Sequence, residues 1–194
     1  MSPATIIPQL EETVQAPTIC TSTPNLLSLA GKTVAITGAG RGLGITLALA
    51  VLESGGHVAC LDILPSPSPK EWAELQKVAK ASGSTATYRR CDVTDEKNVT
   101  EAMEEIAEEA DQAGAPFWGA VACAGIQQAC PALDYEKEDF ERILRVNVTG
   151  VFLTAKRAAR ILVEKKRPGS IVLIASMSGQ IANRVSDKDD LESC

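Results

Sequence analysis

A glycine-rich stretch early in the chain has the spacing of a phosphate-binding loop. It reads Thr-Gly-Ala-Gly-Arg-Gly-Leu-Gly over residues 37–44 and lies between a short apolar run and a run with helical periodicity. Glycines permit a tight turn there and let the backbone approach a pyrophosphate without a Cβ in the way. The first amides of the following helix are unpaired and carry a partial positive charge, which attracts phosphate oxygens. The stretch therefore predicts a dinucleotide-binding site.

A carboxylate follows this loop at the distance that such a site requires. Asp62 lies eighteen residues after Gly44, at the end of a second apolar run. It can accept hydrogen bonds from both hydroxyls of an adenosine ribose and would repel a 2′-phosphate, so it slightly favours NAD over NADP. Arg41 is either a contact for a 2′-phosphate or a solvated loop cation. The structural alternative for the whole set is a tight turn followed by a helix-capping aspartate.

The elements that would position these residues alternate regularly along the chain. Short apolar runs rich in β-branched residues predict strands at 32–37, 57–62, 85–91, 117–122 and 170–175. Helical periodicity predicts helices at 42–54, 70–81 and 94–113, and one or two helices over 136–165. The strand runs are too uniformly apolar to have one wet face. We therefore expect the α/β class, a doubly wound parallel sheet of Rossmann type that stops after its fifth strand.

Composition and charge exclude several classes of protein. The 194 residues are 45% hydrophobic, which is enough chain for one domain with its own core. A net charge of −6 argues against a broad basic surface for nucleic acid and against a polybasic membrane anchor. No apolar run reaches the roughly 18 residues that cross a bilayer. Six scattered cysteines and a single histidine fit reduced thiols better than a zinc site or a disulfide framework, so we expect no metal.

The two ends of the chain differ from its middle. Residues 1–24 contain four prolines and two adjacent glutamates but no arginine, a pattern that fits neither a secretory signal nor a mitochondrial presequence. We expect a disordered extension over 1–28 and a cytoplasmic location. A dinucleotide-binding domain is expected over 29–184. Residues 185–194 are charged and aperiodic, and we expect them to be a tail outside that domain.

Together these motifs resemble the short-chain dehydrogenase/reductase family over residues 29–184, with most similarity to fungal polyol, sugar or secondary-metabolite reductases. The family's cofactor motif, Thr-Gly-x-x-x-Gly-x-Gly, corresponds to residues 37–44. Asp92 and Val93 match the pair that contacts the adenine ring. The resemblance implies cofactor contacts from Thr37, Gly38, Arg41, Gly42, Leu43, Gly44, Asp62, Asp92, Val93, Ala124 and Gly125.

The resemblance also implies two catalytic positions. Asn147, in the run Arg-Val-Asn-Val-Thr-Gly, matches the helix asparagine of the family's catalytic tetrad. Ser176, in the run Ile-Ala-Ser-Met-Ser, matches the serine delivered by a strand. Each position has a structural alternative. Ser176 also fits an ordinary strand-end serine, and Asn147 also fits a side chain that satisfies backbone groups at a bend near Gly150.

Two departures from the family pattern stand out. Ala-Cys-Ala-Gly at residues 122–125 replaces Asn-Asn-Ala-Gly, which removes asparagines that brace the sheet near the cofactor. The Tyr-x-x-x-Lys that follows the serine is absent. Tyr88 and Tyr135 both precede Ser176, and Lys188 is the only later lysine. A tyrosine has a pKa near ~10 and needs that lysine and the cofactor ribose to carry a proton near neutrality.

The expected function is hydride transfer between NAD(P)(H) and a small carbonyl compound or secondary alcohol, impaired here because the proton carrier is absent. The alternatives are a non-catalytic dinucleotide-binding or interaction module, and a truncated or mis-spliced product. The change of sequence after Arg184 favours truncation. Neither nucleic acid nor a membrane is expected as a partner. The family is usually homo-oligomeric, and residues 136–165 resemble one of its two dimer helices. The second is missing, so we expect exposed apolar surface there.

Overall fold

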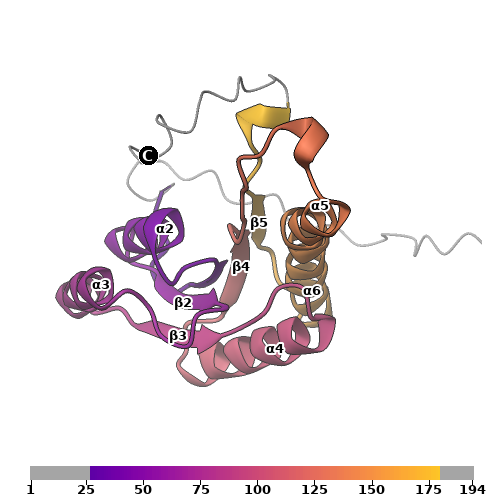
Figure 1. The fold of residues 1–194 in the computed structure, drawn as a ribbon. Coiled ribbons are helices and arrows are strands. Elements are labelled where there is room, and N and C mark those ends of the chain that lie inside the picture. Colours follow the sequence, from indigo (N-terminus) through magenta and orange to yellow (C-terminus); the bar gives the residue numbers. More distant parts are fainter. Residues whose placement is uncertain (1–26, 180–194) are drawn as a thin grey trace, which may run out of the picture.

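The structure, a computed structural model, describes residues 27–179, and five parallel strands of this part form one sheet (Figure 1). The strand order is β3-β2-β1-β4-β5, so the connections reverse direction between β1 and β4. The expected extension over 1–28 and tail over 185–194 lie mostly or wholly outside the described residues. The strands are β1 (Thr33–Thr37), β2 (His57–Asp62), β3 (Ala86–Arg90), β4 (Phe117–Ala122) and β5 (Ser170–Leu173).

Helices cover both faces of this sheet (Figure 1). The expected fold class is confirmed, and each expected strand and helix is present with its ends within a few residues. One or two helices were expected over 136–165, and the structure has two α-helices there, joined by a π-helical segment, η2 (Arg145–Gly150). The helices are α2 (Gly42–Glu53), α3 (Pro69–Ser82), α4 (Glu96–Gln112), α5 (Lys137–Leu144) and α6 (Val151–Glu164), with short 3₁₀ segments η1 (Ala132–Asp134) and η3 (Met177–Gly179).

The core has two halves that meet at the central strands. All five residues of β1 are buried, and neighbouring side chains point to opposite faces. Ile36 packs among residues of α2 and α3. Ala35 packs on the other face with residues of α4 and α6. Burial on both faces explains why the strand runs lack a polar alternation.

Apolar side chains remain exposed along α5, η2 and α6. Phe140, Leu144, Val148 and Phe152 recur every fourth residue and are 42–61% exposed. β5 is an edge strand of the described sheet, and Leu173 on it is also exposed. The apolar surface expected over 136–165 is therefore present, while association of copies through it stays a prediction. Within residues 27–179, no helix is both long and apolar enough to cross a bilayer.

Replacing Phe117 with alanine should lower the free energy of unfolding by about 3–5 kcal/mol. Phe117 on β4 is 1% exposed in the cluster with α4 and α6, so its loss leaves a cavity. Urea denaturation followed by circular dichroism measures the change. Leu133→Ala is the matched control, because Leu133 is fully exposed and its loss should change stability by less than about 0.5 kcal/mol. Equal effects of the two substitutions would contradict this account of the core.

Candidate functional site

A cleft of about 790 Å³ opens at the carboxyl ends of β1, β2, β3 and β4. It lies beside the point where the strand order reverses, which is where open α/β sheets bind ligands. Its size falls within the usual range of small-molecule sites. Ten of the eleven cofactor residues expected from the sequence line it: Gly38, Arg41, Gly42, Leu43, Gly44, Asp62, Asp92, Val93, Ala124 and Gly125.

The glycine-rich loop is packed too closely for side chains. A Cβ on Gly38 would lie 2.7 Å from the Cα of Ala124, and its φ of +69° disfavours other residues. A Cβ on Gly44, in the first turn of α2, would lie 2.2 Å from the carbonyl oxygen of Gly38. The backbone thus lines the cleft directly, and the first turn of α2 contains no acidic residue. This is the geometry in which the amides of a helix N-terminus donate hydrogen bonds to a bound anion.

Asp62 ties this loop to the segment after β2. Its Oδ2 accepts a hydrogen bond from the Gly40 amide at 2.8 Å, and its Oδ1 accepts one from the Leu64 amide at 3.1 Å. The carboxylate caps neither α2 nor α3, so the helix-capping alternative is wrong. Each carboxylate oxygen has a second lone pair for a further donor. Asp62 therefore lines the cleft with a fixed, negatively charged acceptor.

Glu71 of α3 is a third acid in the cleft, beside Asp62 and Asp92, and it was not expected from the sequence. Its Oε1 accepts a hydrogen bond from the Gly42 amide, the first residue of α2, at 3.0 Å. Hydrogen bonds from Ser68 and Gly42, with the charge of Arg41, lower the pKa of Glu71. The run Ser68-x-x-Glu71 has the spacing of a capping box for α3. However, the Ser68 amide donates to the Gly40 carbonyl, and the Glu71 side chain reaches the other helix.

Asp92, after β3, is held by its own turn. Its Oδ1 accepts hydrogen bonds from the amide and the hydroxyl of Thr94, at 2.9 and 2.8 Å. The Asp92 amide donates to Oδ1 of Asn98 at 2.7 Å. The neighbouring Cys91 also lines the cleft, but burial raises the pKa of its thiol to about 11, so the thiol stays neutral. Within residues 27–179, no group of three or more His, Cys, Asp or Glu side chains is arranged to hold a metal ion.

The segment after β4 is held from both sides. Asn147, in η2, accepts a hydrogen bond from the Ile126 amide and donates one to the Ile126 carbonyl, both at 2.8 Å. Thr37, at the end of β1, accepts hydrogen bonds from the amides of Cys123 and Ala124 at 3.1 and 3.2 Å. Thr37 is buried beneath the cleft, and its hydroxyl supplies bracing at the position where the family's asparagines are missing. The structural alternative for Asn147 was that it satisfies backbone groups at a bend near Gly150. It does satisfy backbone groups, but these are the amide and the carbonyl of Ile126.

The remaining candidate side chains lie away from the cleft wall. Ser176 follows β5, is exposed, and accepts a hydrogen bond at Oγ from the Ser178 amide at 3.2 Å. It does not line the cleft. Tyr88 cannot replace the absent tyrosine, because its hydroxyl donates to the Leu64 carbonyl at 2.8 Å and burial raises its pKa to about 12. Tyr135 does not line the cleft either.

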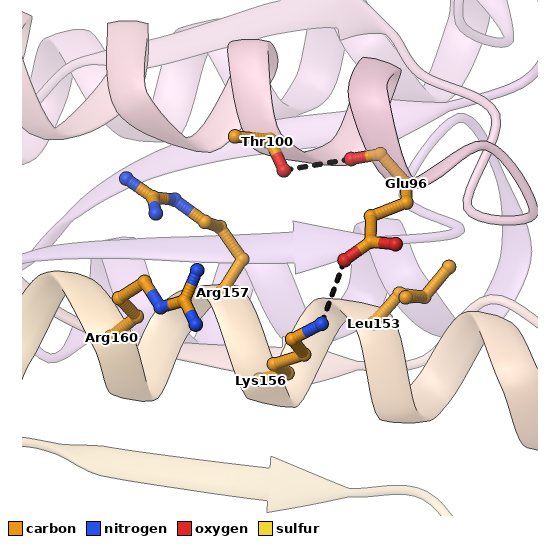
Figure 2. A pocket seen from close by; sticks show the side chains of 6 residues that line it. All are labelled: Glu96, Thr100, Leu153, Lys156, Arg157 and Arg160. Atoms are coloured by element: carbon orange, nitrogen blue, oxygen red, sulfur yellow. Dashed lines mark hydrogen bonds and ion pairs between the residues drawn. The ribbon is translucent and has the colours of Figure 1, made fainter.

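A second, much smaller cavity lies between α4 and α6 (Figure 2). Lys156 on α6 donates to Glu96 on α4 at 2.7 Å, and this hydrogen bond lowers the pKa of Glu96. Arg157 pairs with Glu104 nearby. A cavity of about 20 Å³ holds little more than one water molecule. These charges join two helices rather than form a ligand site.

Replacing Asn147 with leucine should free the backbone of Ile126. Leucine keeps the approximate size of the side chain but offers neither donor nor acceptor. We expect hydrogen exchange at the Ile126 amide to rise at least roughly tenfold, because its partner is lost. Exchange measured by NMR or mass spectrometry tests this. Gln128→Leu is the control, since that side chain contacts Asp139 and Arg142 rather than the backbone of Ile126. Unchanged exchange in the Asn147 variant would remove the bracing role.

Comparison with known proteins gives a consistent result. A family model described as short chain dehydrogenase matches residues 32–186. A short chain dehydrogenase/reductase from Aspergillus versicolor, notP′, is 39% identical over 166 residues, which are 86% of this chain and 56% of that protein. The chain thus spans little more than half of the length of this curated relative.

Solved structures of an NAD⁺-bound enzyme and of an NADPH-dependent enzyme resemble the chain. An NAD⁺-bound xylitol dehydrogenase is 30% identical with a TM-score of 0.69, over 81% of this chain and 57% of that one. An NADPH-dependent 3-quinuclidinone reductase from Rhodotorula rubra is 29% identical with a TM-score of 0.74, over 91% of this chain and 62% of that one.

Proposed function

This chain belongs to the short-chain dehydrogenase family, and from that premise we propose that it binds a nicotinamide dinucleotide for hydride exchange with a carbonyl compound or secondary alcohol. The observation that carries the proposal is the cleft of about 790 Å³ at the reversal of strand order. Loops from four strand ends bring the glycine-rich backbone, Asp62 and Asp92 into it. A cradle closed to Cβ atoms at Gly38 and Gly44 suits a pyrophosphate.

Each part of the cleft suits one part of a dinucleotide. The amides that follow Gly42 in the first turn of α2 would hold the pyrophosphate, since the Gly42 amide itself donates to Glu71. Asp62 would accept from the hydroxyls of the adenosine ribose. Asp92 and Val93 would contact the adenine. Ala124 and Gly125 would line the opposite end, braced by Thr37 and Asn147. The bound cofactor supplies hydride transfer at its nicotinamide ring, while the protein contributes orientation and charge.

We propose NAD as the preferred cofactor. Asp62 is fixed in the cleft by two backbone amides, so its charge stays in place when a ligand arrives. A 2′-phosphate beside that carboxylate would be repelled. Arg41 also lines the cleft, and whether it attracts a 2′-phosphate depends on the negative charges of the acids around it.

The proposed catalytic roles differ between two residues. Ser176 would donate a hydrogen bond to the substrate oxygen. Asn147 is a positioning residue in this structure, since its side chain holds Ile126. The 194-residue sequence contains no tyrosine after Ser176, so the general acid of the family's reaction is missing from it. General acid catalysis contributes roughly 10²–10⁴-fold, and we propose correspondingly slow turnover for this chain.

The missing general acid also supports a second candidate function, a dinucleotide-binding module without catalysis. Both proposals predict that cofactor binds in the same cleft. They differ in the effect of adding a segment that contains the tyrosine. An enzyme of this family should then reduce its substrate, whereas a binding module should remain inactive.

Wild-type chain should bind NADH more tightly than NADPH, and Asp62→Asn should reduce that discrimination. Asparagine keeps one acceptor oxygen but removes the charge that repels a 2′-phosphate. Isothermal titration calorimetry with both dinucleotides gives the two dissociation constants. Asp95→Asn is a matched control, because that carboxylate caps α4 outside the cleft. Tighter binding of NADPH by the wild-type chain would overturn the preference.

The 194-residue chain should reduce sugars and ketones at negligible rates. Fusion of a family segment with its tyrosine and lysine after Ser176 should restore reduction, followed as loss of NADH absorbance. Ser176→Ala in the fusion should then lower kcat about 10²-fold or more, since the hydrogen bond to the substrate oxygen is lost. An ordinary enzymatic rate from the unmodified chain would show that another group carries the proton. A fusion that binds cofactor but stays inactive would favour the binding module.

A further inference from the structure

Glu71 places a carboxylate at the N-terminus of a helix to which it does not belong. It lies on α3, twenty-nine residues beyond Gly42, yet its Oε1 accepts the hydrogen bond of the Gly42 amide at 3.0 Å. Arg41 is the N-cap residue of α2 and forms no side-chain cap there. The negative charge that commonly stabilises the start of a helix is thus supplied to α2 from another helix.

The surroundings of Glu71 show why this contact affects ligand binding. Glu71, Arg41 and Asp62 all line the same cleft. Arg41, Arg142 and Arg145 all line the cleft, and Arg41 is the one that belongs to the glycine-rich loop. A nearby arginine is what accommodates a 2′-phosphate in dinucleotide sites.

Asp62 accepts a hydrogen bond from the Gly40 amide, and Glu71 accepts one from the Gly42 amide. Two carboxylates therefore bind the amides on either side of Arg41 in the loop, and the charge of Arg41 contributes to the lowered pKa of Glu71.

We propose that Glu71 determines cofactor specificity by balancing the charge of Arg41, so that the cleft rejects the 2′-phosphate of NADP. The proposal rests on the proposed dinucleotide site and adds a residue to it. Asp62 already repels a 2′-phosphate, and the second carboxylate, bound to the amide that follows Arg41, adds to this repulsion. A 2′-phosphate carries close to two negative charges at neutral pH, so it is much more sensitive to an added carboxylate than a ribose hydroxyl is.

A purely structural role for Glu71 makes a different prediction. If its carboxylate only capped α2, removing its charge would loosen the glycine-rich loop. Binding of NADH and NADPH would then weaken together, and the melting temperature would fall. A specificity role instead changes NADPH binding alone, because only that ligand has the 2′-phosphate.

Glu71→Gln separates the charge of this side chain from its hydrogen bond. Glutamine keeps an oxygen that can accept from the Gly42 amide but has no negative charge. We expect the Kd for NADPH to fall roughly three- to tenfold, while that for NADH changes less than about twofold. Glu74→Gln is the matched control on the same helix, since Glu74 pairs with Lys77 at 3.0 Å outside the cleft. It should leave both dissociation constants unchanged.

A double variant tests whether Arg41 carries the effect. In an Arg41→Gln background, Glu71→Gln should no longer tighten NADPH binding, because the cation whose charge Glu71 balances is gone. Titration calorimetry of the 194-residue chain with NADH and NADPH at low and moderate salt gives all the constants, and the gain should shrink as salt rises.

The outcomes distinguish this proposal from the one on which it rests. If the wild-type chain binds NADH and Glu71→Gln leaves NADPH binding unchanged, the cofactor site stands and the role of Glu71 is refuted. A parallel change for both cofactors, or a gain that persists without Arg41, refutes it as well. If the wild-type chain binds neither dinucleotide, the cofactor site itself is refuted and the role of Glu71 falls with it.

Discussion

Backbone amides at the carboxyl ends of the strands have no partner in the sheet, and the whole cleft depends on how they are satisfied. A buried amide without a partner costs about 1–3 kcal/mol, so polar side chains must reach these loops. Thr37 does so for the segment after β4, and Asp62 for the glycine-rich loop. Asn147 completes the set at Ile126. The residues that allow the loops to fold are therefore the residues that line or support the site.

This double use has a consequence for ligand binding. Asp62 and Asp92 are already held by backbone donors before any ligand arrives, so little side-chain entropy remains to be lost. The backbone around Gly38 is fixed as well, because it packs closely against the backbone of Ala124. A site built this way is preorganised, and its selectivity comes from fixed charges rather than from adjustment.

The sequence was sufficient to predict the sheet, the helices and most of the cleft, because these follow from local periodicity and from motif spacing. Asp62 was predicted because it follows the glycine-rich loop at the spacing that a dinucleotide site requires and ends the apolar run of β2. Glu71 was missed because its spacing from Ser68 indicates a local cap, whereas its actual partner is twenty-nine residues away on another helix. Helical periodicity likewise could not show that residues 145–150 form a π turn, since α and π turns expose similar patterns of side chains over so short a segment.

The π turn over residues 145–150 determines which residues of α6 face the sheet. Its hydrogen bonds span one residue more than those of an α-helix, so α6 begins rotated relative to a continuous helix. Six residues in a π turn rotate the chain about as far as five residues of an α-helix, so deleting one residue from 145–150 would remove the bulge and leave the faces of α6 where they are. Deleting a residue from α5 or α6 would instead turn the rest of α6 by about 100°, and Ala158 and Ile161, now buried against the sheet, would then face elsewhere. The π turn is therefore the place in this pair of helices where the number of residues can change with the least effect on packing.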